Sequence, residues 1–458
     1  MQLAEVVFVA LLLYTMPFVF YQVLTFERSF RVTYSLKKAS AAKLLDPKVS
    51  IIVPTKGEDI STVLELVRLL NESRYSDFFE IIIVSDDDED YVEKLKVELS
   101  GFRNVRVFRR EVRRGYKACA LQYGLERANG DYIVTLDVDS RLDPDDLIRA
   151  IELMEQEGCD AVTLRWRGYY KRWSLTALGV LVTTSLVSRS LFLGRRGKNF
   201  AQFPVGSGTI FRASSLRKVG GWDCDVIQDD LEVGSRLMSE GMNICSSPYE
   251  IKVEVPSTLK AFVIQQSRWS YGTAETLRKN FSKILTSRQM TFLKKLDALW
   301  YLLQYTPISA VFVAMTLLAV LAFTPYGFDV PLPLMAAWAF SLSVYAYAFI
   351  KETEEVNEVK GLFKLRSMGR ISSLSAGISP YILYGFVRGL TGGMTYKVTP
   401  KGGKPADRYV PVWTIILGGV YVAGSAKYLL DHDFVSALWL FYYGLAYVYT
   451  AYVGFKEG

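Results

Sequence analysis

Aspartates gather at two points where a β-branched apolar run gives way to polar residues. Asp86 and Asp87 follow the run EIIIV, and Asp137 and Asp139 follow YIVTL. Carboxylate oxygens are the ligands that Mg²⁺ and Mn²⁺ favour, and both ions share their coordination with substrate phosphates. An Asp-x-Asp pair alone is more often a solvated turn. Its position after the most apolar run of an alternating region favours a cation site at Asp137 and Asp139.

A third acidic group, Gln228-Asp229-Asp230, precedes the amphipathic run LEVGSRLMSEG, which predicts a helix with one face against a core. A carboxylate at a helix N-terminus is held in its ionised form by the helix dipole and the free amides. This arrangement suits capping, and it equally suits a general base held in place, so Asp230 is the candidate base. The acidic run DPDD at 143–146 is interpreted as helix capping, with its first aspartate as the N-cap and its proline as the first helical residue.

Loops with basic and glycine residues supply further groups that a phosphorylated sugar would need. VPTKGED, which contains Thr55 and Glu58, follows the first apolar run and could receive a nucleotide base or ribose. Lys117, in GYKACALQ, could reach phosphates, and the Gly206-Ser207 turn would let the backbone approach a sugar. Each of these segments, taken alone, is more often an ordinary loop.

The pentapeptide QQSRW at 265–269 stands just ahead of a long apolar stretch. One interpretation is an amphipathic helix whose tryptophan lies at a membrane interface while its arginine extends toward the headgroups. The other is a ligand site, because the donor fork of Arg268 suits phosphate and the indole face of Trp269 suits a sugar.

The elements between residues 49 and 260 decide how these groups are placed. The runs VSIIVPT, EIIIVSDD, VRVFRR and DYIVTLDVDS are typical of strands, and amphipathic helical patterns separate them. Strand and helix in alternation predict an α/β domain with a mostly parallel sheet and helices on both faces. In such sheets ligands bind beyond the carboxyl ends of the strands, which is where the aspartates stand.

Apolar segments of membrane-spanning length flank this region. Acidic residues mark the short loops 324–330 and 431–433, whereas lysines and arginines fill 351–408 and the stretch after the first segment. The positive-inside rule therefore predicts a cytoplasmic catalytic domain, an N-terminus outside and a C-terminus inside. The candidate spans are residues 6–24, 298–323, 331–350, 410–429 and 435–453.

Three further apolar or basic segments are not expected to be spans. Segment 175–193 is expected to be an interfacial helix or a helix buried in the protein, 275–296 to lie at the bilayer surface, and 378–390 to be interfacial or re-entrant. The expected organisation follows directly. It is a membrane anchor (1–25), a basic linker (26–48), the α/β domain (49–274), an interfacial helix (275–296), a helical hairpin (297–350), a cytoplasmic loop (351–408) and a second hairpin (409–458).

Composition narrows the class of protein. The 458 residues are 50% hydrophobic and 22% charged with a net charge of +7, which suits a membrane protein with a large soluble part. One histidine excludes a multi-histidine metal site, and no RNA- or DNA-binding signature appears, so no nucleic-acid partner is expected. The four cysteines form no CxxC pair and are expected to be small buried thiols in a reducing compartment.

In order and spacing these segments resemble the inverting glycosyltransferases of family two, which have the GT-A fold, and more narrowly the membrane-bound branch that includes cellulose and hyaluronan synthases. The resemblance runs through VSIIVPTKGED, SDDDED, GYKACALQ, LDVDS, VGSGTIFR, IQDDLEVGSRL and QQSRW, and extends to YKVTPKG at 396–402. The last is similar to a gating loop that closes over the nucleotide. The resemblance covers residues 49–290 well and the membrane part more loosely.

The resemblance implies a role for each group. Donor contacts would come from Asp86 and Asp87 at the base and ribose, Asp137 in the Asp-x-Asp motif, Arg268 at the diphosphate, and Thr399 and Lys401 in the gating loop. The metal, Mg²⁺ or Mn²⁺, would bind Asp139. Asp230 would be the base, and Trp269 would floor the acceptor subsite. Thr55, Glu58 and Lys117 complete the expected donor site, and Gly206, Ser207, Asp229 and Gln265 the expected acceptor site.

The resemblance also implies partners: a UDP- or GDP-linked sugar donor, a glycan or polyprenyl- or dolichyl-linked acceptor, and membrane lipids. Two departures stand out, Gln228 where the family has threonine and Tyr396 where cellulose synthases have phenylalanine. Because the predicted spans are fewer than in cellulose synthases, extension of a lipid-linked glycan is favoured over a processive polysaccharide synthase. Two rival hypotheses are a glycoside hydrolase and a catalytically inactive scaffold that binds sugar nucleotides.

Overall fold

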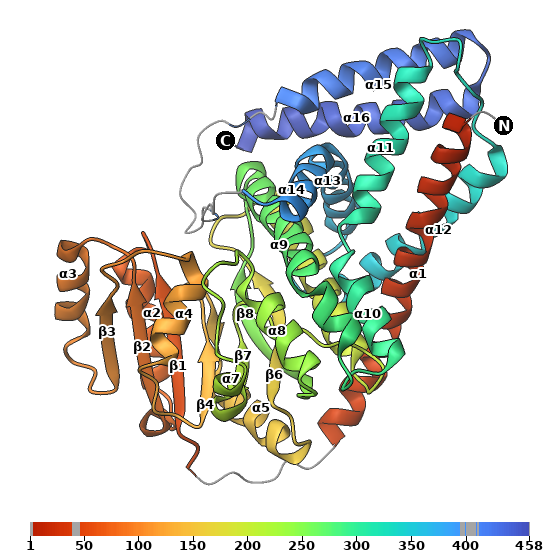
Figure 1. Cartoon of the computed structure of the whole chain (residues 1–458). Helices are drawn as coiled ribbons and strands as arrows, with labels where there is room; N and C mark the ends of the chain where they lie inside the picture. Colours follow the sequence, from red (N-terminus) through yellow and green to blue (C-terminus); the bar gives the residue numbers. More distant parts are fainter. Residues whose placement is uncertain (1–2, 39–45, 394–398, 400–408, 410–411, 458) are drawn as a thin grey trace.

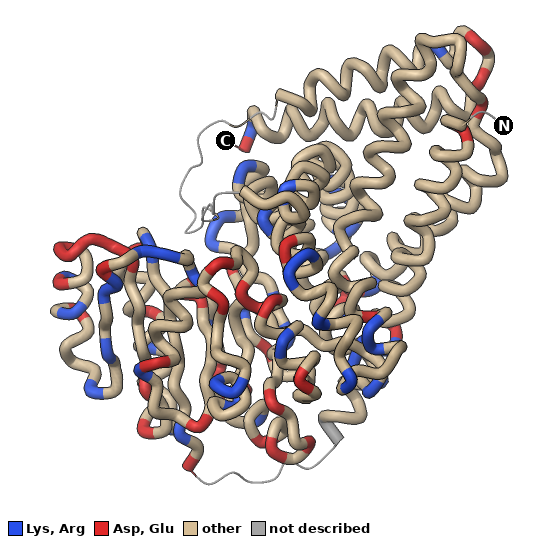
Figure 2. Tube along the Cα trace, in the orientation of Figure 1, with Lys and Arg blue, Asp and Glu red and all other residues tan. Residues whose placement is uncertain are grey.

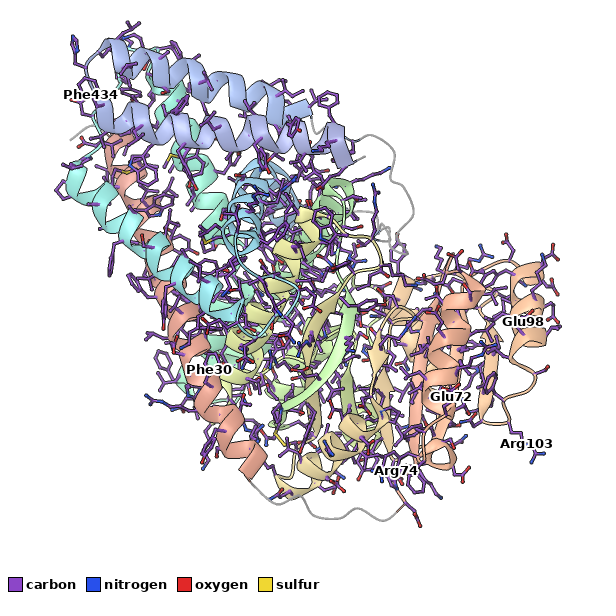
Figure 3. The ribbon with its side chains drawn as sticks, turned by 180° about the vertical axis from the view of Figure 1, so that it is seen from behind. Phe30, Glu72, Arg74, Glu98, Arg103 and Phe434 are labelled. Carbon is purple, nitrogen blue, oxygen red and sulfur yellow. A yellow bond between two sulfur atoms is a disulfide. The ribbon has the colours of Figure 1, made fainter. Side chains whose placement is uncertain are left out.

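A computed structural model describes residues 3–38, 46–393, 399, 409 and 412–457. One part is a sheet covered by helices, and the other is a group of long helices that extends away from it (Figure 1). In the reverse view, Phe434 lies at the far tip of the helical part, opposite Glu98 and Arg103 beside the outermost strand (Figure 3).

The sheet has eight strands in the order β3-β2-β1-β4-β7-β6-β8-β5. Four strand pairs are parallel (β1–β2, β1–β4, β2–β3 and β6–β8) and three are antiparallel (β4–β7, β6–β7 and β5–β8). The α/β fold with a mostly parallel sheet is therefore confirmed. The strands are β1 (Val49–Thr55), β2 (Phe79–Ser85), β3 (Val105–Arg109), β4 (Tyr132–Thr135), β5 (Arg141–Leu142), β6 (Ala161–Tyr169), β7 (Thr209–Arg212) and β8 (Ile244–Glu254).

Strand register brings the first two aspartate groups together. Thr55 at the end of β1 pairs with Ser85 at the end of β2, and Ile52 of β1 pairs with Thr135 at the end of β4. Parallel strands in this register end at one edge of the sheet, so the residues that follow β2 and β4 emerge side by side. This is the edge at which the sequence predicted ligand binding.

Helices cover both faces of the sheet because alternate strand residues are apolar on each side. Ile51 of β1 packs into a core with α2, α3 and α5, whereas Ile52 packs on the opposite side with α4, α7 and α8. At the start of α5, the Asp143 side chain accepts from the backbone N–H of Asp145 at 2.9 Å, which confirms the predicted cap. These helices are α2 (Ile60–Asn71), α3 (Glu89–Leu99), α4 (Tyr116–Leu125), α5 (Pro144–Gln156), α7 (Ala213–Lys218) and α8 (Asp229–Ser239), with a short 3₁₀ turn η1 (Ser76–Phe78) before β2.

The remaining helices are longer and more apolar, and charged residues thin out along those farthest from the sheet (Figure 2). They are α1 (Leu3–Lys38), α6 (Leu175–Val187) with its continuations η2 (Ser188–Phe192) and η3 (Leu193–Arg195), α9 (Leu259–Thr286), α10 (Phe292–Leu302), α11 (Thr306–Leu321), α12 (Leu332–Glu352), α13 (Phe363–Gly377), α14 (Ser379–Thr391), α15 (Val412–Leu430) and α16 (Phe434–Glu457).

Within the described part of the chain, five helices are long and apolar enough to cross a membrane, and they are not quite the five predicted. Segments 3–36, 332–352, 412–430 and 434–457 agree with the prediction. The predicted span 298–323 falls on two helices, α10 and α11, which pass the same test of length and composition together but bend by 52° at their junction. Segment 175–195 qualifies by length, yet 78% of its window is buried inside the protein, in line with the interior position allowed for it.

The predicted boundary at residue 275 lies inside a helix. α9 continues without a break from Leu259 to Thr286, so residues 275–286 extend the helix that carries QQSRW, and do not form a separate element. α14 lies along α9, where the Ser270 hydroxyl donates to the Ile382 carbonyl at 2.8 Å. A side chain at Gly385 would come within 2.5 Å of the Ser267 carbonyl oxygen, so glycine permits this close approach.

The four cysteines form two disulfides, Cys119–Cys224 and Cys159–Cys245. The prediction of free buried thiols was therefore wrong. The partners are 105 and 86 residues apart along the chain, so their spacing carried no sign of pairing. Cys119–Cys224 ties α4 to the loop that leads into α8, and Cys159–Cys245 ties β8 to the turn before β6.

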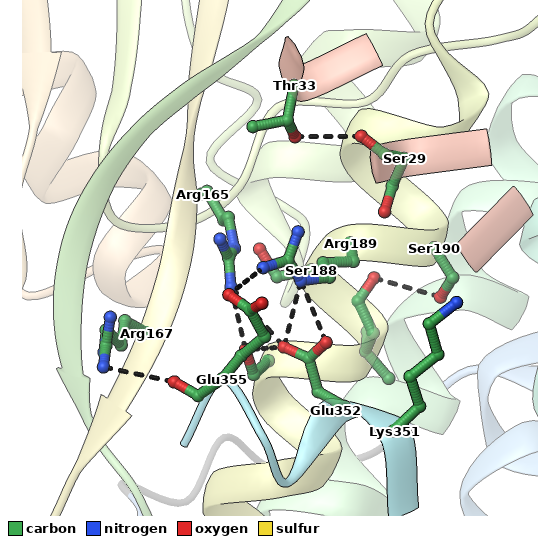
Figure 4. Close-up of polar contacts among 12 residues, drawn as sticks. Ser29, Thr33, Arg165, Arg167, Ser188, Arg189, Ser190, Lys351, Glu352 and Glu355 are labelled. Carbon is green, nitrogen blue, oxygen red and sulfur yellow. Dashed lines mark hydrogen bonds and ion pairs between the residues drawn. The ribbon is translucent and has the colours of Figure 1, made fainter. Parts of the chain in front are cut away.

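A buried ionic cluster joins the end of α12 to the sheet (Figure 4). Glu352, which is 0% exposed, pairs with Arg189 of η2 at 2.9 Å and with Arg165 of β6 at 3.5 Å. Arg189 reaches Glu355 at 2.7 Å, and Arg165 reaches Glu250 of β8 at 3.1 Å. This cluster explains why Arg189 interrupts an apolar segment, because its charge is paired inside the protein.

Candidate active site

A cavity of about 180 Å³ opens beyond the carboxyl ends of β1, β2 and β4. Loops after these strands, the Gly206-Ser207 turn, the start of α8 and one face of α9 line it. The structure brings fourteen of the predicted site residues to this wall: Thr55, Glu58, Asp86, Lys117, Asp137, Asp139, Gly206, Ser207, Asp229, Asp230, Gln265, Arg268, Trp269 and Thr399.

One predicted residue that the structure describes, Asp87, does not line the cavity. Asp87 turns toward the loop after β1, where its carboxylate accepts from the Gly57 N–H at 2.7 Å and from the Ser85 hydroxyl at 2.8 Å. It therefore supports the loop that carries Glu58. Lys401 lies outside the described residues, as does Tyr396, whereas Thr399 is buried against the cavity.

Asp86 is held in a bidentate ion pair that the sequence did not reveal. Arg110 donates from Nε and Nη2 to the two carboxylate oxygens at 2.7 and 2.6 Å, and both residues are buried. Arg110 also donates to the carbonyls of Arg114 and Tyr116, which lead into α4. The ion pair therefore occupies one lone pair on each carboxylate oxygen of Asp86. It also orients the loop before Lys117.

Lys117 joins the loops on both sides of the cavity. Its ammonium group donates to Asp137 at 2.6 Å and to the Gly206 carbonyl at 2.7 Å. The Ser207 hydroxyl accepts from the Asp137 backbone N–H at 3.0 Å. The Asp-x-Asp loop and the Gly-Ser turn are thus locked together, with the lysine charge beside them.

The carboxylates after β4 fit a hard divalent cation. Asp139 is 7% exposed and lines the cavity, and Asp137 lies beside it. Mg²⁺ and Mn²⁺ sites for phosphate substrates need only one or two carboxylates, because the phosphates and water supply the other ligands. The other acidic group with ligand-like spacing in the described chain, Glu157 with Cys159 and Cys245, contains a disulfide and offers no thiolate.

Asp230 stands at the start of α8 with an altered acidity. Burial and the neighbouring Asp229 carboxylate raise the pKa of Asp230 to about 7, although Lys117 and a hydrogen bond from Gln228 act in the opposite direction. Burial also raises the pKa of Asp229. A carboxylate with a pKa near neutrality both holds and releases a proton at physiological pH, which is what a general base requires.

α9 presents the QQSRW residues to the same space. The Thr258 hydroxyl caps the helix by accepting from the Ala261 N–H at 3.3 Å. Arg268 and Trp269 line the cavity, and the positive charge of Arg268 favours the ionised form of Asp229 and so opposes the rise in its pKa. The helical interpretation and the ligand-site interpretation of QQSRW are therefore compatible.

A second cavity, of about 340 Å³, adjoins the first between α1, α6, α9, α10 and α11. Six residues line both cavities and so mark their junction: Trp166, Thr184, Gln228, Asp230, Gln265 and Trp269.

Trp166 of β6 was not predicted as a site residue. Its ring centroid lies 6.1 Å from that of Trp269, its indole N–H donates to the Ser207 carbonyl at 2.8 Å, and its backbone N–H donates to the Ser188 hydroxyl at 2.8 Å. A tryptophan inside an ordinary strand pattern carries no local signal, so only the packing of β6 against α9 reveals it.

The chain is similar in sequence to known proteins. The family described as "Glycosyl transferase family group 2" matches residues 132–351. A probable glycosyltransferase of Sulfolobus acidocaldarius is 39% identical over 464 residues, which cover 98% of this chain and 99% of the relative. The glucomannan 4-beta-mannosyltransferase 2 of Arabidopsis thaliana is 31% identical over 232 residues, and the match spans 48% of this chain and 43% of that protein.

The fold has a solved counterpart. A mannosyltransferase from Pyrobaculum calidifontis, determined in complex with GDP-Man and Mn²⁺, superposes with a TM-score of 0.57 at 18% identity and covers 85% of this chain and 99% of its own. This likeness shows a GT-A-type fold. The family match and the relative that matches almost end to end establish that the chain belongs to the family-two glycosyltransferases.

Proposed function

We propose that the chain is an inverting, metal-dependent hexosyltransferase that moves a sugar, with mannose as the favoured candidate, from a nucleotide diphosphate to a membrane-associated glycan acceptor. The observation that carries the proposal is the position of Asp230 at the junction of two cavities. The first holds the charged groups that a sugar diphosphate needs, and the second is large enough for an acceptor. Two of the relatives are named mannosyltransferases, which supports GDP-mannose as the donor.

The reaction is one displacement at the anomeric carbon. Asp230 takes the proton of an acceptor hydroxyl, the acceptor oxygen forms a bond to the anomeric carbon, and the bond to the diphosphate oxygen breaks on the opposite side. Configuration therefore inverts, and the nucleoside diphosphate leaves. Holding both partners across one junction provides the in-line positioning on which such a reaction depends.

The first cavity would stabilise the leaving group. Arg268 and Lys117 place positive charge beside it, and Asp139, with Asp137, would hold a divalent cation. When bound, the cation neutralises charge on the diphosphate. Thr399 also lies at the wall of this cavity.

We place the first cavity on the cytoplasmic side and the acidic loops outside. The Val330 N–H donates to Ser436 at 3.2 Å, and Phe8 packs on Phe328 with centroids 5.5 Å apart. The start of α1 and both acidic loops therefore lie at one end of the helical part, away from the sheet (Figure 2). This common position supports an N-terminus outside, as the charge pattern predicted.

The test is donor selection followed by product analysis. Purified protein is incubated with GDP-mannose, UDP-glucose and UDP-N-acetylglucosamine, each labelled in the sugar, with Mn²⁺ and a lipid extract. One donor should give a labelled product of inverted anomeric configuration that extracts with lipid and is longer by one or a few sugars. A long polymer would identify a processive synthase instead, and no transfer from any donor would refute the proposal.

The pH profile of transfer is expected to report Asp230. Because the base must be ionised and its pKa is raised to about 7, kcat/KM should rise with pH to half its plateau near pH 7. Asp229→Asn removes one cause of the raised pKa, so its midpoint should move to lower pH. An unchanged midpoint in Asp229→Asn would contradict the coupling of the two carboxylates.

Removal of divalent metal is expected to stop transfer. With EDTA in excess, the rate should fall at least about 100-fold, because charge neutralisation by a cation is worth several kcal/mol in such reactions. Mn²⁺ added back should restore the rate, and Asp139→Asn should need more Mn²⁺ for half-maximal activity. Full activity in EDTA would remove the metal from the scheme.

A further inference from the structure

The two adjoining cavities differ sharply in charge. The first contains the cationic side chains Lys56, Lys117 and Arg268 together with several carboxylates. Among the described residues that line the second, Asp230 at the junction is the one side chain of Asp, Glu, Lys or Arg. A site for a phosphate-bearing acceptor would be expected to supply arginine or lysine, because these form the strong charge-assisted bonds that phosphates require.

Uncharged side chains line most of the second cavity instead, and they are amides, aromatic rings, hydroxyls and aliphatic groups. The amides come from α1, α9, and the loops that follow α10 and precede α8, and most of the rings come from α1, α9 and α10. A ring face stacks on the C–H face of a sugar, and an amide both donates to and accepts from hydroxyl groups. The glutamines are Gln22, Gln228, Gln265, Gln266 and Gln304.

Arg195 lies close to this cavity but is already paired. It is 0% exposed, lies 4.4 Å from the Tyr301 ring centre, and pairs with Asp297 at 2.5 Å. Its Nε also donates to the Tyr21 hydroxyl at 2.9 Å. Arg195 is not among the residues that line the cavity and its charge is paired with Asp297, so it does not make the cavity a phosphate site.

Two buried polar atoms at the cavity have no hydrogen-bond partner among the described residues: the Gln228 side-chain carbonyl oxygen and the Trp300 indole nitrogen. The first needs a donor and the second an acceptor. A sugar hydroxyl is both, whereas an ionised phosphate only accepts and would be repelled by the Gln228 oxygen and the Asp230 carboxylate.

The nature of the base leads to the same conclusion. A hydroxyl must lose its proton to become a nucleophile, and Asp230 lines the second cavity where that proton would be taken. A lipid phosphate is already an anion at neutral pH and needs no base. A base between the cavities therefore matches a hydroxyl acceptor.

From these observations we infer that the second cavity receives the terminal sugar rings of a neutral glycan, with Trp166 and Trp269 as the ring faces that hold the sugar next to Asp230. Trp166 is then a specificity-determining residue for the acceptor. Any charged lipid linkage lies outside the cavity, so the enzyme extends a pre-existing glycan and does not glycosylate a lipid phosphate directly. The inference rests on the proposed function and names its acceptor class.

An acceptor panel tests the chemical class. The full chain in detergent with Mn²⁺ and its best sugar nucleotide is given mannotriose, cellotriose, chitotriose or dolichyl phosphate as acceptor. We expect at least one neutral trisaccharide to be glycosylated about tenfold faster or more than dolichyl phosphate. Equal or faster transfer to dolichyl phosphate would overturn the inference, as would donor hydrolysis that no neutral saccharide accelerates.

A separate measurement distinguishes this failure from failure of the proposed function. Binding of GDP-mannose, UDP-glucose and UDP-N-acetylglucosamine is measured by calorimetry without acceptor. If a sugar nucleotide binds and transfer goes only to the lipid phosphate, the inference falls together with the glycan acceptor of the proposed function, whereas sugar transfer from the nucleotide stands. If no sugar nucleotide binds, the proposed function falls and the inference falls with it.

Variants test the individual residues. Trp166→Ala should raise KM for the neutral saccharide about tenfold and leave the donor KM within about twofold, the change that a lost stacking contact produces. Trp166→Phe keeps a ring face and should recover most of the loss, which separates stacking from a merely structural role. If Trp166→Ala fails to fold, quenching of tryptophan fluorescence in the unaltered chain by the trisaccharide, but not by dolichyl phosphate, tests the same site.

Gln304→Leu provides a matched pair with Gln156→Leu. Gln304 lines the second cavity, whereas Gln156 is exposed at the end of α5. We expect Gln304→Leu to raise KM for the saccharide about threefold or more through loss of a hydrogen bond, and Gln156→Leu to leave it unchanged. Equal values for the two variants would remove Gln304, and with it the amide lining, from acceptor recognition.

Discussion

Asp230→Asn is expected to lower kcat about 10²–10⁴-fold, which is the range that a positioned general base contributes. The amide has the shape of the carboxylate and can still accept from the Leu231 N–H, which lies 2.8 Å from the carboxylate in the unaltered chain. It cannot take a proton from the acceptor. Steady-state transfer assays with the preferred donor measure the loss.

Two controls separate this chemical effect from damage to the fold. Donor affinity in Asp230→Asn should stay within a few-fold, since Lys117 and Arg268 remain in place. Asp145→Asn alters an exposed carboxylate in the first turn of α5, and its rate should match that of the unaltered protein. A rate in Asp230→Asn within tenfold of normal would assign the base to another group.

Glu352→Ala is expected to destabilise the protein by about 3–5 kcal/mol, the cost of removing one partner from a buried ion pair. Arg189 and Arg165, both under 10% exposed, would then face each other with too little negative charge between them. The Ser185 hydroxyl would also lose its acceptor. Thermal unfolding in detergent should show a clearly lower midpoint.

The neighbouring glutamate supplies the matched control for this prediction. Glu354 is exposed, two residues beyond Glu352 on the same stretch of chain, and Glu354→Ala should leave the midpoint unchanged. Glu352→Gln keeps the shape and the bond from Ser185 but loses the charge, so it should fall between the two. A normal midpoint in Glu352→Ala would mean that the ionic cluster does not stabilise the junction of α12 with the sheet.

The stability of this cluster bears on activity as well. Ser188, next to Arg189 on η2, accepts from the backbone N–H of Trp166. A shift of η2 in Glu352→Ala would therefore move one of the two indoles at the acceptor side. The end of a long apolar helix and the acceptor site are thus connected through a few buried contacts.

Much of the site could be predicted because its residues follow strands and begin helices. Asp86 and Asp137 each follow an apolar run, and Asp230 stands at the start of a helix. Once the alternation of strands and helices was recognised, these positions predicted that the three residues lie at one edge of the sheet. Parallel strands impose that edge, because every strand in the same direction ends on the same side. QQSRW was assigned to the site through its resemblance to the Gln-x-x-Arg-Trp motif of the family.

Residues that act through distant contacts could not be predicted in this way. Arg110 follows a strand like any other basic residue, and its pairing with Asp86 depends on the parallel register of β2 and β3. The two disulfides join cysteines that are 105 and 86 residues apart. The bend between α10 and α11 was missed because the apolar pattern continues across it.

The sequence by itself determined the α/β class, the family and the candidate base, because strand ends, helix starts and motif spacing are local properties of the chain. Only the tertiary structure decided that Asp230 stands between a charged and a neutral cavity, and that Trp166 lies beside Trp269. These features depend on how β6, α8 and α9 pack against one another, and packing between elements far apart in the chain leaves no periodic trace in the order of the residues.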